Sequence, residues 1–185
     1  MSRADFDFII VGSGFGGSVS ALRLSQKGYR VAVIEQGRRW SPENLPKTNW
    51  NTRNYIWRPA LGLRGFFNMR FFRHVVVLHG SAVGGGSITY AQTMWQPADS
   101  VWGEGEWANL ADWRALMPQH YATAKKMLGA SMNQRPSWAD EQLHVMAKSA
   151  GVDDSFYHTE VAVFFGDESK PQGASYPDPY FDGKG

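Results

Sequence analysis

The stretch DFIIVGSGFGGSVSALRLSQKGYRVAVIE, residues 7–35, decides the fold of this chain. The apolar run 8–11 predicts a strand, and a glycine-rich turn follows it directly. The spacing of apolar residues predicts a helix over roughly 14–27, which Gly28 would end. A second apolar run, 31–34, predicts another strand. We therefore expect a strand–turn–helix–strand unit that begins an α/β domain.

Three glycines in the turn have the spacing G-x-G-x-x-G, at Gly12, Gly14 and Gly17. The first permits a tight turn, the second lets the backbone approach a ligand, and the third lets the helix pack closely on the strand. The first turn of the helix then presents unpaired N–H groups and a partial positive charge. This pattern predicts a site for the diphosphate of a dinucleotide.

The surroundings of the glycine motif support this prediction. Glu35 lies 23 residues after Gly12, close to the ~20 expected of an acid that accepts a hydrogen bond from a ribose hydroxyl. Several side chains of the helix suit a face packed on a sheet: Val19, Ala21, Leu22 and Leu24. A glycine-rich turn without a ligand has no use for three glycines and a terminal acid together.

The turn alone leaves NAD, NADP and FAD open. Glu35 argues against NADP because a carboxylate repels a 2′-phosphate, although Arg38 or Arg39 could accommodate that phosphate. The run from Gly12 to Glu35 resembles the amino-terminal signature of two-dinucleotide-fold flavoproteins, which favours FAD. The residues that have the spacing of that signature are Gly12, Gly14, Gly17, Ala21, Leu24, Gly28, Val31 and Glu35.

A second glycine-rich motif, HGSAVGGGSITYA at residues 79–91, follows the apolar run 75–78, which predicts a strand. The motif resembles the second glycine-rich segment of glucose–methanol–choline (GMC) oxidoreductases, and most closely that of the cholesterol-oxidase-like branch. The resemblance implies a segment that passes beside the FAD diphosphate and isoalloxazine. Three successive glycines let backbone N–H groups reach the cofactor, and Ser87 adds a hydroxyl.

The resemblance implies a set of FAD contacts in both motifs. The predicted cofactor site consists of Gly12, Gly14, Phe15, Gly16, Gly17, Glu35, Gln36, Gly80, Gly85, Gly86, Ser87, Tyr90, Ala91 and Thr93. Many relatives have Asn at the position of Tyr90, and the close branch often has Gly at that of Ala91. Since no histidine occupies 89–91, we expect FAD to be bound without a covalent histidyl link.

The resemblance further implies an oxidoreductase that oxidises an alcohol, with a sterol-like substrate as the more specific suggestion, by hydride transfer to FAD. GMC enzymes carry the catalytic His and its Asn/His partner near their carboxyl end, so we expect no catalytic residue here and an inactive chain. We interpret the chain as an amino-terminal fragment of such an enzyme. The alternatives are an NAD(P)-dependent dehydrogenase and a non-catalytic FAD-binding fragment.

We expect an α/β fold with a Rossmann-like parallel sheet flanked by helices. Residues 1–108 are predicted as an incomplete FAD-binding domain and 109–185 as the start of a substrate domain. In the second part we predict a helix at 109–129 that Pro118 kinks or divides, a helix at 138–150 and a strand at 161–165. The Pro/Gly/Tyr-rich run that leads to residue 185 is predicted to be a loop.

Composition limits the other functions. The chain has no cysteine, which excludes disulfides and thiolate metal sites, and its five histidines lack metal-ligand spacing. A net charge of +2 is too small to argue for nucleic acid. Without an apolar signal segment or a span of ~20 apolar residues, the cytoplasm is the expected location.

Charge is concentrated in residues 38–73, which carry eight basic residues, one acid and many aromatics. We interpret this stretch as an excursion over the cofactor and the substrate entrance. Contact with an anionic membrane surface is the second alternative and single-stranded nucleic acid the third. Because a parallel sheet needs neighbouring strands, we expect the isolated chain to be less stable than a whole enzyme, or to self-associate or pair with a missing carboxyl-terminal half.

Overall fold

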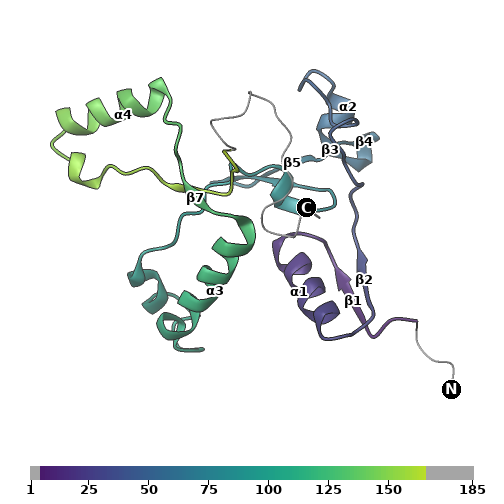
Figure 1. Cartoon of the computed structure of the whole chain (residues 1–185). Helices are drawn as coiled ribbons and strands as arrows, with labels where there is room; N and C mark the ends of the chain where they lie inside the picture. Colours follow the sequence, from purple (N-terminus) through teal and green to yellow (C-terminus); the bar gives the residue numbers. More distant parts are fainter. Residues whose placement is uncertain (1–4, 166–185) are drawn as a thin grey trace. The chain divides into compact units, whose positions relative to one another are not determined.

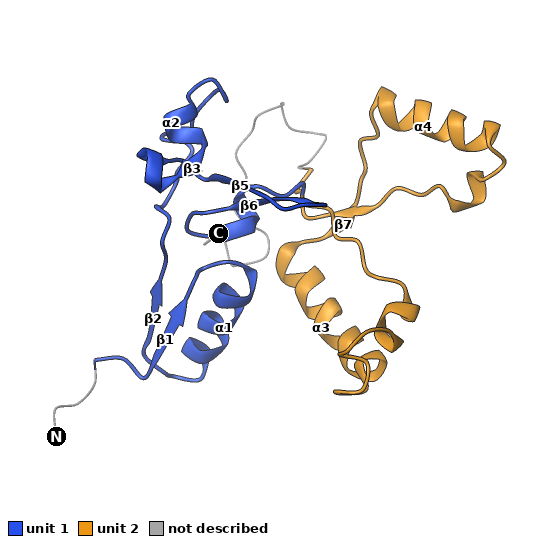
Figure 2. Ribbon diagram, turned by 180° about the vertical axis from the view of Figure 1, so that it is seen from behind, with its two compact units in different colours: residues 1–91 blue, residues 92–185 orange. Residues whose placement is uncertain are grey.

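The computed structural model describes residues 5–165, which form parts of two compact units, 1–91 and 92–185 (Figure 2). The units meet in sequence at Ala91 and Gln92. The assignment of 1–108 to an FAD-binding domain and of 109–185 to a substrate domain stays a prediction. The loop predicted for the Pro/Gly/Tyr-rich run lies outside the described residues.

Unit 1 begins with the strand–turn–helix–strand unit that the sequence predicts. Strand β1 (Phe8–Val11) leads into helix α1 (Phe15–Gln26), and strand β2 (Val31–Ile34) follows. The two strands are parallel, with Phe8 opposite Val31 and Val11 opposite Ile34, and α1 lies beside them (Figure 1). The predicted α/β start of the fold is confirmed.

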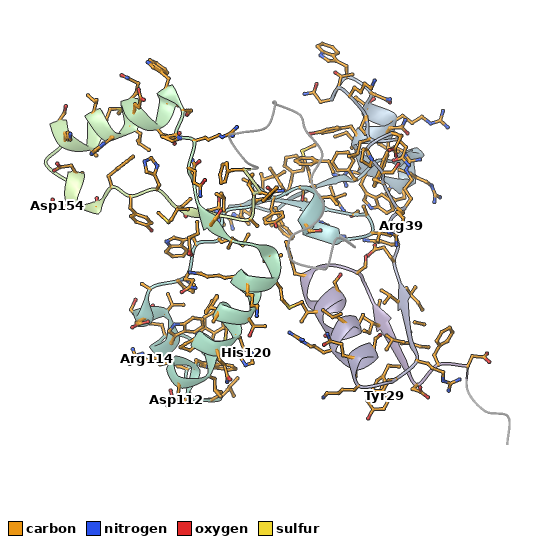
Figure 3. All side chains as sticks on the ribbon, viewed as in Figure 1. Tyr29, Arg39, Asp112, Arg114, His120 and Asp154 are labelled. Atoms are coloured by element: carbon orange, nitrogen blue, oxygen red, sulfur yellow. The ribbon has the colours of Figure 1, made fainter. Side chains whose placement is uncertain are left out.

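Helix α1 ends where the sequence predicts. The N–H of Lys27 donates to the carbonyls of Arg23 and Leu24, and Gly28 then adopts a φ of +87°, which glycine reaches without strain. Tyr29, labelled in Figure 3, follows directly and places its ring edge-on to Phe8 at a centroid distance of 4.9 Å. This contact ties the turn after α1 back to the start of β1.

The predicted packing face of α1 is only partly correct. Ala21 and Leu24 are half-buried, but Val19 is 57% exposed and Leu22 is 38% exposed. The parallel sheet has two strands in the described residues, so it is too narrow to cover all the apolar side chains of the helix. The sheet flanked by helices that the sequence predicts therefore appears only as one helix beside two parallel strands.

The rest of unit 1 consists of short helices and antiparallel pairs. Helix α2 (Thr52–Tyr55) precedes strand β3 (Trp57–Arg58), and the 3₁₀ turn η1 (Pro59–Leu61) joins β3 to strand β4 (Leu63–Arg64). Strand β5 (Phe67–Phe71) pairs with β6 (Val76–Gly80). The strand predicted at 75–78 is thus confirmed as β6, which begins one residue later and extends to Gly80.

Aromatic rings from the basic stretch form a cluster in unit 1. Phe66 is buried at 9% exposure, with the rings of Trp40 and Tyr55 edge-on to it at 5.5 Å and 5.1 Å. Tyr55 also stacks on Phe67 at 5.4 Å. Since aromatic pairs of this geometry add stability beyond the area they bury, the cluster holds α2 against the start of β5.

Unit 2 contains the 3₁₀ turn η3 (Asp99–Gly103), helix α3 (Trp113–Leu128), strand β7 (Ser131–Met132), helix α4 (Trp138–Ser149), the 3₁₀ turn η4 (Asp153–Ser155) and strand β8 (Glu160–Val161). Both predicted helices are confirmed. Across residues 5–165, no helix is long and apolar enough to cross a membrane.

Helix α3 differs from its prediction in two ways. It begins at Trp113, because the Asp112 side chain accepts from the N–H of Ala115 and caps the helix there. It also continues through Pro118 as one helix, so of the two predicted outcomes the division is excluded and the kink stays a prediction. Gly129 ends the helix in the left-handed conformation, as predicted.

The strand predicted at 161–165 is mostly wrong. Only Glu160 and Val161 belong to β8, where they pair with β7. After Val161 the N–H of Ala162 donates to the carbonyl of Gln92, so the chain leaves the ladder with β7. The apolar run therefore forms no long strand. It pairs briefly with β7 and then bonds to Gln92, both within unit 2.

Candidate functional site

The glycine turn opens onto the amino end of α1. Gly12 has a φ of +92°, a conformation that side chains disfavour, and its N–H donates to the carbonyl of Ile34 at 2.7 Å. The first bond of the helix runs from Ser18 N–H to Gly14 carbonyl at 2.8 Å. Among the described residues, the N–H groups of residues 15–17 have no acceptor. The helix therefore presents three free donors at its positive end.

The glycines of the first motif divide into two kinds. A Cβ atom at Gly17 would collide with the carbonyl oxygen of Gly12, so glycine is needed there for the helix to pack on the turn. A Cβ atom at Gly14 or Gly16 would meet nothing within 4 Å. Close packing therefore explains Gly17, whereas Gly14 and Gly16 leave open space beside the free donors.

Glu35 lies at the end of β2 and is held by three hydrogen bonds. Its Oε2 accepts from the N–H and the hydroxyl of Ser13, both at 2.8 Å, and its Oε1 accepts from Gly37 N–H at 3.0 Å. Burial favours the neutral acid, but the bonds from Gly37 and Ser13 together outweigh it and hold the pKa of Glu35 below its usual value. The group is therefore a carboxylate at neutral pH.

Ser13 joins the two glycine motifs, and sequence reasoning missed it. This side chain is 8% exposed. Its hydroxyl donates to Glu35 and accepts from the N–H of Gly84 at 3.0 Å, across 71 positions of sequence. The only sequence signal was a small polar residue between the first two glycines. Its partner in the second motif could not be identified without the tertiary structure.

The second motif packs directly on the first. It forms the 3₁₀ turn η2 (Gly85–Ile88) after β6. A Cβ atom at Gly85 would lie 2.7 Å from the Cα of Gly14, and one at Gly80 would collide with the carbonyl oxygen of Gly85. These glycines let three stretches of backbone meet at the mouth of α1.

Phe15, Gly86 and Tyr90 also meet in this region. The rings of Phe15 and Tyr90 lie edge-on at 5.3 Å, and a Cβ atom at Gly86 would approach the Phe15 ring to 3.1 Å. Tyr90 N–H donates to the carbonyl of Gly86 at 3.1 Å. The aromatic pair thus closes one side of the contact between α1 and η2.

The remaining predicted site residues lie at the edges of this arrangement. Gln36 is exposed after β2, and the exposed Ser87 donates to the carbonyl of Gly84 at 2.9 Å. Ala91 is the last residue of unit 1. Thr93 belongs to unit 2, where it forms a β-bridge with Val161. The structure thus brings together the predicted residues from both glycine motifs within unit 1.

Comparison with known proteins agrees with this arrangement. A family described as an NAD(P)-binding Rossmann-like domain matches residues 10–75. This range contains the first glycine motif and Glu35. It supports a dinucleotide-binding domain of the Rossmann type at the amino end of the chain.

Three relatives extend the comparison to the whole chain. Cholesterol oxidase of Acinetobacter baumannii is 56% identical over 185 residues, which are 100% of this chain and 33% of the relative. Cholesterol oxidase of Mycobacterium tuberculosis (strain CDC 1551 / Oshkosh) is 44% identical over 184 residues, 99% of this chain and 32% of the relative. An uncharacterized GMC-type oxidoreductase of the same strain is 33% identical over 101 residues, 51% of this chain and 15% of that protein.

The chain spans about a third of the length of the two cholesterol oxidases. The aligned region covers both glycine motifs and both units, so the similarity is not confined to the Rossmann-like start. The resemblance inferred from the two motifs is confirmed: the whole chain is similar to the amino-terminal third of cholesterol oxidases, and about half of it is similar to a GMC-type oxidoreductase.

Proposed function

We propose that this chain is the FAD-binding amino-terminal part of an oxidoreductase that oxidises an alcohol. The similarity to two cholesterol oxidases supports a sterol-like or other hydrophobic alcohol as the substrate. Because the chain spans about a third of those relatives, the activity is proposed for a whole protein and not for this chain alone. The proposed location remains the cytoplasm.

One observation carries the proposal. The two glycine motifs meet at the free N–H groups of α1 and are joined by the bond from Gly84 N–H to the Ser13 hydroxyl, across 71 positions of sequence. Open space at Gly14 and Gly16 leaves these donors accessible to a diphosphate. A site for NAD or NADP needs only the first glycine motif. The second glycine motif beside it therefore favours FAD.

The residues present fit FAD in chemical terms. The free N–H groups of residues 15–17 would bind the diphosphate, and the ionised Glu35 has acceptor capacity left for a ribose hydroxyl. The second motif would present Gly85 and Gly86 to the cofactor. When bound, FAD would supply the hydride acceptor that oxidation of an alcohol requires.

We assign the residues of this chain to holding the cofactor and none to proton transfer. The base that takes the hydroxyl proton would belong to a segment matching the carboxyl-terminal two thirds of the relatives. In this proposal, residues 109–185 would begin a substrate domain and the parallel sheet would gain strands from the remainder.

Titration with FAD tests the cofactor proposal. A Cβ atom at Gly14 meets nothing within 4 Å, so Gly14→Val should leave the melting temperature nearly unchanged and weaken FAD binding by about tenfold or more. Gly103→Val serves as the control, because a Cβ there meets only the Arg114 side chain at an ordinary 3.5 Å. Equal FAD affinity for Gly14→Val and the unchanged chain would refute the site.

The same titration separates the alternatives. Tighter binding of NAD or NADP than of FAD would replace the proposal with an NAD(P)-dependent dehydrogenase. If FAD binds, alcohol-dependent bleaching of the flavin absorption should be absent for this chain alone. Bleaching should appear once a segment that matches the carboxyl-terminal two thirds of the relatives is joined to it. FAD binding that never leads to turnover in the joined protein would favour a non-catalytic FAD-binding module.

A further inference from the structure

A second cluster of charge in unit 1 lies outside the glycine motifs. A cavity of about 390 Å³ is lined by Arg38, Arg53, Asn54, Gly62 and Arg64. The three arginines come from different elements: the segment after β2, helix α2 and strand β4. No acidic residue contributes to the lining. Three separate parts of the chain therefore deliver like charges to one cavity.

These charges have no carboxylate partner in the described residues. The ion pairs there join Arg30 to Asp7 and Lys125 to Glu160, and neither involves a residue of the cavity. The one acid between residues 38 and 73, Glu43, bonds to the Ser41 side chain instead. The positive charges that share this cavity repel one another. A bound anion would attract each of them and offset that repulsion.

One arginine is already held in place. The Arg38 guanidinium donates from Nη2 to the Asn54 side-chain oxygen at 3.1 Å, and its Cζ lies 3.7 Å from the centre of the Trp40 ring. Asn54 is fixed in turn, because its N–H donates to the carbonyl of Asn51 at 3.1 Å. A donor that is ordered before binding loses less conformational entropy when it binds a ligand.

The backbone brings the other two arginines together. A side chain at Gly65 would collide with the backbone of Tyr55, so glycine permits α2 and β4 to lie in contact. The N–H of Gly65 donates to the carbonyl of Ile56 at 2.9 Å, which fixes that contact. Arg53 and Arg64 each lie within two positions of it in sequence. Their approach is therefore a consequence of the fold.

We propose that the cavity lined by Arg38, Arg53 and Arg64 binds a phosphate group. Three planar guanidinium groups from separate directions match the several oxygens and the double charge of phosphate better than a single carboxylate. The phosphate could belong to a small phosphate ester or to a lipid headgroup. The cavity shares no lining residue with the proposed FAD diphosphate site, which consists of backbone donors at α1.

Binding of inorganic phosphate to the whole 185-residue chain, measured by calorimetry, tests the first source. Co-sedimentation with phosphatidylcholine vesicles, with and without phosphatidylglycerol, tests the second. The double variant Arg53→Gln/Arg64→Gln should weaken whichever binding occurs by about tenfold or more. Arg73→Gln is the control, since Arg73 belongs to the same basic stretch but does not line the cavity. It should change binding less than about twofold.

Two results would overturn the proposal: binding to neither probe, or equal loss in the control and the double variant. If the double variant does not fold, Arg64→Gln alone decides between the same outcomes. FAD titration keeps this site apart from the proposed function. Arg53→Gln/Arg64→Gln should retain FAD affinity, and Gly14→Val should retain phosphate affinity, so either proposal can fail without the other.

Discussion

Ser13 shows how one buried hydroxyl can organise a backbone site. It donates to Glu35 at the end of β2 and accepts from Gly84 in the second glycine motif. The mouth of α1 therefore keeps its shape through a side chain that need not touch the proposed cofactor.

Replacement of Ser13 by alanine should lower the free energy of unfolding by about 2 kcal/mol, because Gly84 N–H loses its acceptor and Glu35 loses a donor. Chemical denaturation monitored by circular dichroism measures the change. Ser20→Ala is the control, since Ser20 is exposed on α1, the helix that follows the turn. A loss of similar size in both variants would show that the Ser13 hydroxyl has no special role.

Gly17 and Gly16 provide a second matched pair. Gly17→Ala should destabilise the chain by about 2 kcal/mol, because its Cβ would collide with the Gly12 carbonyl. Gly16→Ala has open space and should raise stability by about 0.5 kcal/mol through helix propensity. Thermal unfolding of both variants tests this. Similar melting temperatures for the two variants would show that the turn relaxes around an added methyl group.

The lowered pKa of Glu35 links stability to pH. A carboxyl group with a lower pKa in the folded chain stabilises it above the unfolded pKa, and this contribution is lost as the pH falls through the folded pKa. The unchanged chain should therefore be more stable than Glu35→Gln near about pH 7, and the difference should shrink toward about pH 3. Melting temperatures of both across this range provide the measurement. A difference independent of pH would contradict the assignment.

Helix α4 shows how its own sequence specifies a secondary-structure element. Ser137 and Asp140 form a capping box, in which Ser137 Oγ accepts from Asp140 N–H and Asp140 Oδ2 accepts from Ser137 N–H. Gly151, with a φ of +70°, follows the other end. These signals lie within one continuous stretch, which explains why the sequence predicts this helix well.

Loss of the cap should therefore weaken α4 locally. Ser137→Ala should speed hydrogen exchange in the first turn of α4 by about fivefold, since Asp140 N–H loses its acceptor and the start of the helix frays. Exchange measured by NMR reports each amide separately. Gln142→Ala is the control, because Gln142 is exposed in the middle of the helix and does not cap it. Uniform acceleration along the whole helix in both variants would argue against a local effect.

Several apolar side chains on the strands are unusually exposed. In the described residues, Val11 is 85% exposed, Ile9 is 63% exposed and Leu78 is 56% exposed. Strands of a Rossmann-type sheet are ordinarily covered on both faces. Uncovered strands of this kind favour association with a second copy or with a complementary segment.

Sedimentation velocity should consequently show an average sedimentation coefficient that rises with protein concentration. Ile9→Thr should reduce this rise, because it keeps a β-branched side chain on β1 and removes apolar surface. Leu110→Thr is the control at a position that is 76% exposed outside the strands. A monomer with a sharp, concentration-independent melt would contradict the expectation of self-association.

Helix α4 and residues 7–35 show how much of the fold can be predicted before a structure is known. Residues 7–35 encode β1, α1 and β2 because apolar spacing, free amide donors and glycine conformations are all local properties. The same reasoning finds the helix end at Gly28 and the glycine that packs at Gly17. The cofactor site residues that rest on family resemblance stay predictions until FAD binding is measured.

Other features depend on contacts between distant residues. The link from Ser13 to Gly84, the exposure of Val19 and Leu22, and the early end of β8 follow from which segments pair in space. Local sequence cannot specify these partners, because the free energy of a long-range contact depends on both members and on the chain that closes between them. Local chemistry thus established the dinucleotide turn, whereas folding in three dimensions joined it to the second glycine motif.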